Sequence, residues 1–463
     1  MPVPTPLLKF IFHRLTALLL GAVAHATCGI ASAEGLDDHV HGPGCDHQES
    51  VRPIHDDHDG CDHGPGESDS PHHPAIDIGD DSGIHFHPYL NAAISLGGSS
   101  SEKNLDLIAG GHAPVDDGFN LQGIELGSLI EIGPNLAIRA SGNIFWDRYD
   151  GWDAEWEEVF AQLDLPHDWH LRGGRFLVPF GRENALHLHD RDFVEPAISL
   201  VRMLGEEGLY TNGVELIAPL GGDWSLAIGL GYGSSHSHGG NDREARRDAY
   251  LEAIEHAGED DHDDAADAEE DEHHHAHGRA GLGGVYDPDA GYLEDELAHA
   301  RLSGRFGPDQ SWQAGFSAAF GNNAGGLDTW IVGTDLSQNF ELAGRPAWWR
   351  SEAWLGRYQA RDASGASGHY QLSGIYTSLG WQFAEDWITA ARAEWSSGNR
   401  MAGLERRWRL AANLGRTLEF PPAGDAHLRL QYTYDRLGGY GEDHTVWLQC
   451  VLNLGAAHHG HGH

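Results

Sequence analysis

The residues of this chain best suited to chemistry are histidines that recur beside carboxylates in two polar segments. Segments 34–87 and 236–279 together hold 18 of the 33 histidines and 29 of the 71 acidic residues. Imidazole and carboxylate bind first-row divalent ions, and they release the ion as the pH falls because proton and metal compete for the same nitrogen. The sequence therefore predicts divalent-metal binding, without indicating which metal, at His39, His41, Cys45, His47, His55, His58, Cys61, His63, His72, His73, His236, His238, His262, His273, His274, His275 and His277.

The phrase Gly-Cys-Asp-His occurs twice, at 44–47 and 60–63, in a Pro- and Gly-rich stretch with few apolar residues. This composition predicts a disordered tail over 34–83. Cys45 and Cys61 have two alternatives: a disulfide in an oxidising compartment, or thiolate ligands of a metal. The spacing is not that of a structural zinc finger, so solvated low-complexity sequence without selected ligands is the alternative to metal binding.

Charge and hydropathy exclude several classes of protein. A formal net charge of −42 argues against nucleic-acid binding, which depends on cationic contacts to phosphate. After residue 33 no run of about 18 apolar residues could span a bilayer as a helix. Residues 1–33 have the pattern of a secretory signal peptide, with Lys9 and Arg14 near the apolar stretch 15–24 and small residues at 31–33. The sequence thus predicts export.

A long region from 84 to 455 must position the His-rich segments, and it alternates apolar and polar residues. In 84–96, for example, Phe86 and Leu90 fall on one face while His85 and His87 fall on the other. Alternation with a period of two, between Gly, Pro, Asn and Asp, predicts half-buried strands that are long enough to cross a bilayer. The expected fold class is all-β, a transmembrane antiparallel β-barrel of about 16 strands, near 84–96, 121–132, 135–147, 155–165, 168–178, 212–219, 222–233, 291–306, 311–320, 328–338, 347–360, 369–383, 386–396, 405–419, 425–436 and 444–454.

The connections between these strands are expected to alternate strictly between short and long. In outer-membrane barrels the short turns are periplasmic and the longer loops are external. This topology places the tail 34–83 and the His-rich C-terminal tail 456–463 in the periplasm, and the His- and acid-rich loop 234–290 outside the cell. Segment 179–211 is the third external loop in this topology.

Residues 174–181, Gly-Arg-Phe-Leu-Val-Pro-Phe-Gly, and the Leu-Gly-Glu-Glu-Gly at 204–208 carry a resemblance to a known family. They resemble a strand-to-loop phrase of porin-like outer-membrane proteins related to the phosphate-selective porins. Similar proteins with His-rich insertions are labelled zinc-regulated outer-membrane proteins. The resemblance implies a pore-forming barrel in the bacterial outer membrane, in contact with lipid and lipopolysaccharide and assembled as a homotrimer. It also implies that the third external loop, 179–211, folds inward and constricts the pore, as in general porins.

Two sets of residues are predicted to line the pore. The constriction set is His187, His189, Asp190, Arg191 and Asp192, where two imidazoles beside a carboxylate would offer a divalent ion a partial shell; an ordinary charged constriction is the alternative. The lumen set is His85, His87, Arg139, Arg172, His299, Arg301, Arg305, Arg392, Arg409, His427 and Arg429. A wall rich in arginine would favour anions, unless these arginines pair with acids such as Glu394 and Asp435.

These features predict an outer-membrane channel for the uptake of small ions, with divalent zinc concentrated by the His- and acid-rich segments. The alternative is a general, anion- or phosphate-selective porin in which those segments are incidental. A metal-sequestering surface protein that uses the barrel as an anchor is a further alternative. Zinc is expected as a bound or transported ion, and no enzymatic activity, organic cofactor or nucleic-acid partner is expected.

Overall fold

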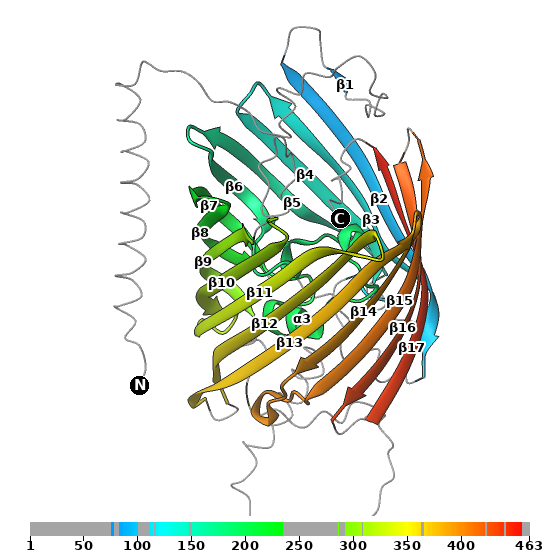
Figure 1. Cartoon of the computed structure of the whole chain (residues 1–463). Helices are drawn as coiled ribbons and strands as arrows, with labels where there is room; N and C mark the ends of the chain where they lie inside the picture. Colours follow the sequence, from blue (N-terminus) through cyan, green and yellow to red (C-terminus); the bar gives the residue numbers. More distant parts are fainter. Residues whose placement is uncertain are drawn as a thin grey trace, which may run out of the picture. The chain divides into compact units, whose positions relative to one another are not determined.

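The computed structural model describes residues 76–77, 83–100, 112–114, 117–147, 151–234, 286, 292–307, 309–362, 365–421, 424–438 and 441–455. In this part of the chain no helix is long and apolar enough to cross a membrane. Sixteen antiparallel strands form a closed ring (Figure 1), and the short β1 (Ile76–Asp77) pairs with the start of β2 outside it. The ring consists of β2 (Ile84–Ser99), β3 (Gly118–Ile132), β4 (Leu136–Asp147), β5 (Gly151–Leu165), β6 (Trp169–Leu177), β7 (Tyr210–Gly221), β8 (Trp224–Ser234), β9 (Leu293–Phe306), β10 (Trp312–Asn323), β11 (Asp328–Leu342), β12 (Arg345–Arg361), β13 (Ser367–Ala384), β14 (Trp387–Ser396), β15 (Arg407–Phe420), β16 (Gly424–Leu437) and β17 (Gly441–Gly455).

The barrel closes because its last strand pairs with its first. β17 runs antiparallel to β2, with Leu448 opposite Leu96 and Leu452 opposite Ala92. Every strand of the ring therefore has two hydrogen-bonded neighbours, and no strand edge of the ring leaves unpaired backbone N–H and C=O groups facing lipid. The predicted fold class and strand number are confirmed.

The two ends of the barrel differ in their connections. At one end, six pairs of strands are joined by two or three residues, and left-handed Gly133 (φ 60°), Gly222 (φ 59°) and Gly344 (φ 73°) allow such tight turns. At the other end, the connections include the long segments 178–209 and 235–292. The strict alternation expected from the sequence is wrong, however, since β4–β5, β10–β11 and β16–β17 are joined at this end by three or four residues. Antiparallel neighbours need no more than a short hairpin.

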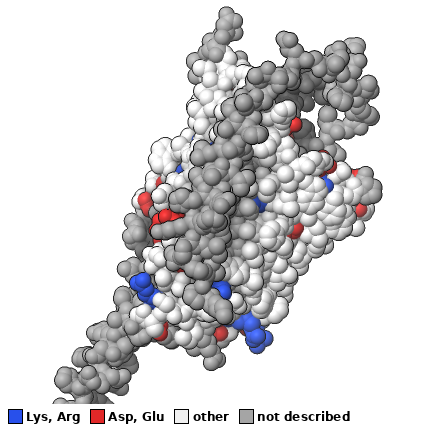
Figure 2. Space-filling view, turned by 90° about the vertical axis from the view of Figure 1, so that its left-hand side faces the viewer, with Lys and Arg blue, Asp and Glu red and all other residues white. Residues whose placement is uncertain are grey.

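The outer face of the barrel is apolar. Side chains alternate along each strand, so Leu430 and Leu448 are about half exposed (51% and 49%), whereas the adjacent Gln431 and Gln449 point inward and are buried. Figure 2 shows one side of the molecule, where uncharged side chains cover most of the described surface and charged ones are scattered. An apolar exterior around a polar interior is the arrangement of a bacterial outer-membrane β-barrel, and it places the protein in that membrane.

The depth of the apolar face leads to a first prediction. Leu430 lies at the middle of β16 and faces outward, so Leu430→Arg should lower the free energy of unfolding in lipid vesicles by about 2–4 kcal/mol. Phe420 also faces outward but ends β15, so Phe420→Arg should cost about 0–1 kcal/mol. Urea titrations followed by tryptophan fluorescence would measure both values, and equal losses would contradict this lipid-facing surface.

Candidate functional site

The connection between β6 and β7, residues 178–209, folds into the barrel and is called the inward loop. It contains two 3-10 turns, η1 (Glu183–Ala185) and η2 (Leu188–Asp190), and one short helix, α3 (Ile198–Leu204), which lies within the ring of strands (Figure 1). All seven residues of α3 are buried. The helix contacts β13 and β14, while η2 contacts β2 and β17, so the loop crosses the interior of the barrel.

Asn184 closes the inward loop at its base. The Val178 amide donates to the Leu209 carbonyl (2.9 Å), the Asn184 side-chain amide donates to the Val178 carbonyl (2.7 Å), and the Leu209 amide donates to Asn184 Oδ1 (2.9 Å). Gly208 has a φ of 84°, and a Cβ there would meet Asn184 Oδ1. A glycine is therefore required, and this tie fixes the position of the adjacent Glu207.

Arg392 of β14 holds the middle of the inward loop. Its guanidinium donates to Glu394 (2.7 Å), to Glu183 of the loop (3.2 Å) and to the carbonyl of Glu195 (2.8 Å). Glu394 also accepts a hydrogen bond from the amide of Ile198 at the start of α3 (2.7 Å). Burial raises the pKa of Glu183 and of Glu195 above the usual carboxyl value, although nearby arginines oppose the shift. Buried Arg409 of β15 also donates to the Pro196 carbonyl of the loop (3.3 Å), so two buried arginines dock the loop on this wall.

Most of the arginines predicted to line the lumen are paired with carboxylates. Four form ion pairs with acids on the barrel wall: Arg139–Glu158 (3.4 Å), Arg172–Glu215 (2.6 Å), Arg301–Asp335 (2.7 Å) and Arg409–Asp435 (3.1 Å). Arg407, which was missed from the sequence, shares Asp435 at 2.7 Å. The wall therefore carries paired charges. The prediction of an uncompensated basic wall is wrong, and the alternative, in which these arginines pair with acids, is the one observed.

The other predicted lumen residues also lie on inward-facing positions. His87 is 3.2 Å from Glu131, and His427 is 3.3 Å from Asp425. His299 is buried and lies 3.6 Å from Glu215. Arg429 donates to Gln449 and to the carbonyl of Arg191. Arg305 is half-buried, and His85 is exposed near the start of β2.

Five carboxylates, three histidines and one arginine gather between the inward loop and β3, β4 and β5. We call this group the His–Glu cluster; its members are His112, Glu125, Arg139, Glu155, Glu157, Glu158, His187, His189 and Glu207. Only His187, His189 and Arg139 were predicted from the sequence. With neutral imidazoles, the cluster would carry an excess of four negative charges.

A β-bulge explains why the glutamates of β5 were missed. In the pairing of β4 with β5, Ser141 lies opposite Glu158 and Gly142 opposite Trp156, so Glu157 has no partner. The extra residue turns both Glu157 and Glu158 inward, where both are buried (4% exposed). Strict alternation would have sent one of them to the lipid face.

His187 and His189 stack on one another and share Glu125 of β3. Their ring centroids are 5.7 Å apart, and Glu125 lies 3.7 Å from His187 and 3.0 Å from His189. His187 also approaches Glu157 (3.2 Å) and Glu158 (3.1 Å). Burial alone would lower the pKa of both histidines, but the surrounding carboxylates outweigh it and raise the pKa of each, that of His187 well above its usual value. The carboxylates around these two histidines therefore favour either protonated imidazoles or a bound cation.

The predicted constriction residues divide between two walls. Asp190 stays beside His189 (3.4 Å), whereas Asp192 turns to the opposite wall and pairs with Arg350 (2.5 Å). The Arg191 carbonyl accepts a hydrogen bond from Arg429 of β16, which lies between these two walls in the ring (2.7 Å). The imidazoles and the Arg191–Asp192 pair therefore do not form one ion shell.

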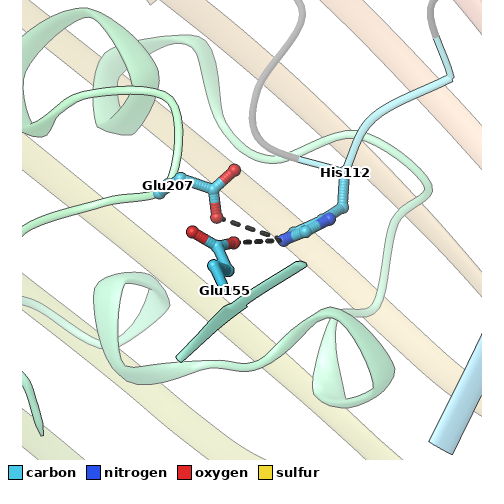
Figure 3. Close-up of side chains that lie close together, drawn as sticks. All are labelled: His112, Glu155 and Glu207. Atoms are coloured by element: carbon cyan, nitrogen blue, oxygen red, sulfur yellow. Dashed lines mark ion pairs between the residues drawn. The ribbon is translucent and has the colours of Figure 1, made fainter. Parts of the chain in front are cut away.

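His112, from the connection between β2 and β3, completes the cluster with Glu155 and Glu207. Its Nε2 lies 3.1 Å from Glu207 and 3.6 Å from Glu155, and Figure 3 shows both carboxylates directed at this nitrogen. Burial would lower the pKa of His112, but Glu207 and Glu155 raise it well above its usual value. The predicted metal ligands from His39 to His73 and from His236 to His277 lie outside the described residues.

Comparison with known proteins gives similarity of fold. No protein-family model and no curated protein sequence matches the chain. Solved structures of similar fold include the outer membrane channel DcaP of Acinetobacter baumannii (TM-score 0.48, 10% identity, covering 81% of this chain and 98% of that one). Others are an anion-selective porin from Comamonas acidovorans (0.44, 11%, 80% and 98%) and the outer membrane protein OpdK from Pseudomonas aeruginosa (0.44, 11%, 80% and 99%).

Proposed function

We propose that the protein is an outer-membrane channel for small ions, with divalent cations, zinc foremost, as its preferred cargo. The observation that supports this most strongly is the His–Glu cluster, in which five carboxylates face one arginine and three histidines at the place where the inward loop meets the wall. Rings and clusters of carboxylates favour cations in a pore. Imidazole beside carboxylate further favours first-row divalent ions over sodium or potassium.

The charge distribution across the lumen favours this assignment over an anion channel. Arg392, Arg407 and Arg409 lie on β14 and β15, but each forms an ion pair with Glu394 or Asp435. Paired arginines leave less positive potential for a passing anion than a ring of free ones. Among the described residues of the His–Glu cluster, by contrast, five carboxylates stand against one arginine and three histidines, a balance that supports a preference for cations.

Anion passage is the second candidate, and one observation favours it. Arg429 faces inward on β16, and its described hydrogen-bond partners are the neutral Gln449 and a loop carbonyl. A guanidinium with neutral partners can attract an anion.

The His-rich segments 34–83, 236–279 and 456–463 remain part of the proposal as zinc-concentrating appendages, and a homotrimer remains the expected assembly.

Zinc entry into vesicles tests the proposal. Purified protein reconstituted into liposomes that contain a trapped zinc-sensitive dye should admit zinc much faster than protein-free liposomes do. Phosphate entry, followed in parallel with a trapped phosphate sensor, should be slower than zinc entry. Rapid phosphate entry with zinc entry at the protein-free rate would favour the anion-porin alternative.

A further inference from the structure

We propose that His112, Glu155 and Glu207 form a binding site for one first-row divalent cation, of which zinc fits best, and that the bound ion ties the inward loop to β5. This inference deepens the proposed function, because it places a bound ion beside the path assigned to cations, and it rests on that proposal for the choice of zinc. The three ligands come from the β2–β3 connection, from β5 and from the inward loop.

The orientation of His112 is the first step. Its Nδ1 lies 2.9 Å from the carbonyl of Gln122, to which it donates, and the Gln122 side-chain amide donates back to the His112 carbonyl (2.8 Å). A histidine that donates one ring N–H to a backbone carbonyl has its other nitrogen set as the ligand atom, which is the usual arrangement around protein-bound metals. Nε2 is therefore the nitrogen presented to Glu155 and Glu207.

A second β-bulge, in β3, leaves the Gln122 carbonyl able to accept the hydrogen bond that orients His112. In the pairing of β2 with β3, Ala93 lies opposite Gly123 and Ile94 opposite Leu121, so Gln122 is skipped. A bulged residue is left out of the ladder, and its backbone carbonyl can accept from a side chain. Phe145 then packs edge-on against the His112 ring at 5.1 Å and restricts its rotation.

The spacing of the ligand atoms is the second step. Zinc binds histidine nitrogen and carboxylate oxygen at about 2.0–2.2 Å in a tetrahedron, so neighbouring ligand atoms lie roughly 3.3–3.6 Å apart. The distances from His112 Nε2 to Glu207 (3.1 Å) and to Glu155 (3.6 Å) are close to this edge length. All three ligand atoms lie within 4.8 Å of one another, so small side-chain movements suffice to enclose an ion.

Glu157 supplies a link to a second group of ligands. One of its oxygens is 3.9 Å from His112 Nε2, while the other is 3.2 Å from His187 Nδ1. Glu125, Glu157 and His187 also have ligand atoms within 4.8 Å of one another. Their oxygens already accept hydrogen bonds, because Tyr89 and Asn91 both donate to Glu125 (2.9 and 3.2 Å). His112 Nε2 in turn lies 3.1 Å from the side-chain amide of Asn143. We assign the ion to the group around His112 because the Gln122 carbonyl orients its ring.

Anomalous diffraction at the zinc absorption edge tests the site directly. Crystals of the full-length protein grown with zinc chloride should show a peak at bonding distance from His112 Nε2, Glu155 and Glu207. The peak should be absent from His112→Ala crystals and present in His170→Ala crystals, because His170 pairs with one carboxylate, Asp164 (2.7 Å), away from the cluster. A wild-type map without this peak, with His112 in direct hydrogen bonds to the glutamates, would overturn the proposal.

A solution measurement guards against a variant that fails to crystallise. Competition with a zinc-binding dye should reveal a site in the wild-type protein whose affinity falls at least about 10-fold in Glu207→Gln and is unchanged in Asp164→Asn. Equal zinc binding by these two variants would reject the site. The liposome assay is carried out on the same preparations. Zinc entry without binding at this site would reject the site but support the channel, and zinc binding without zinc entry would reject the channel but support the site.

Discussion

Replacing Arg392 with alanine should release the inward loop and raise the conductance of the channel. Arg392 neutralises Glu183 and Glu394 and holds the Glu195 carbonyl, so its loss leaves buried carboxylates without their cation. Removing one partner of a buried ion pair costs about 3–5 kcal/mol, and here that cost falls on the contacts between the loop and the wall. Single-channel recording in planar bilayers should show a larger conductance and more frequent fluctuations than wild type.

Arg172→Ala is the matched control for this result. Arg172 is also a buried inward-facing arginine with one carboxylate partner, Glu215, but both lie on neighbouring barrel strands, β6 and β7. Its removal should destabilise the barrel without freeing the loop, so the conductance should stay at the wild-type value. Heat-modifiable mobility on gels would show that each variant is folded. An Arg392→Ala barrel that is folded and has unchanged conductance would contradict the docking role of this residue.

The second large effect concerns ion selectivity. Changing Glu125, Glu157 and Glu158 together to glutamine removes three buried negative charges that face the inward loop. Two charges 4 Å apart interact by about 4 kcal/mol at an effective dielectric constant of 20. Even after screening, we expect the cation-to-anion permeability ratio to fall about 10-fold or more, since about 1.4 kcal/mol corresponds to a factor of ten.

A charge-matched variant separates this effect from a change in net charge. Glu341, Glu385 and Glu419 are exposed at the short-turn end of the barrel, and their replacement by glutamine removes the same number of charges. Reversal potentials measured across a salt gradient should shift strongly for the buried triple variant and little for the exposed one. Equal shifts would mean that the cluster does not set selectivity.

The sequence contained enough to predict the barrel, because its strands alternate strictly over most of their length. The phase of that alternation also predicted which arginines face inward. It could not predict their partners, since these depend on register: Arg409 meets Asp435, and Arg172 meets Glu215, directly across neighbouring strands. Without the register, the same residues are compatible with a free basic wall.

The candidate site was only half predictable for a different reason. His187 and His189 stood out because they lie two residues apart in a loop between expected strands, and they do converge on one carboxylate, Glu125. Glu157 was hidden by the bulge in β5, which adds one residue and reverses the phase of alternation. His112 and Glu207 are brought together only by the folding of two separate connections, for which a sequence carries no periodic signal.

The reversal potential of the wild-type channel tests the central claim most directly. The excess of carboxylates in the His–Glu cluster, set against arginines that are already paired, predicts a channel that prefers cations. In a planar bilayer with a potassium chloride gradient, the reversal potential should therefore have the sign of a potassium potential, and it should move toward zero when micromolar zinc occupies the cluster. A reversal potential of the opposite sign, unaffected by zinc, would contradict the assignment of this barrel as a channel for divalent cations.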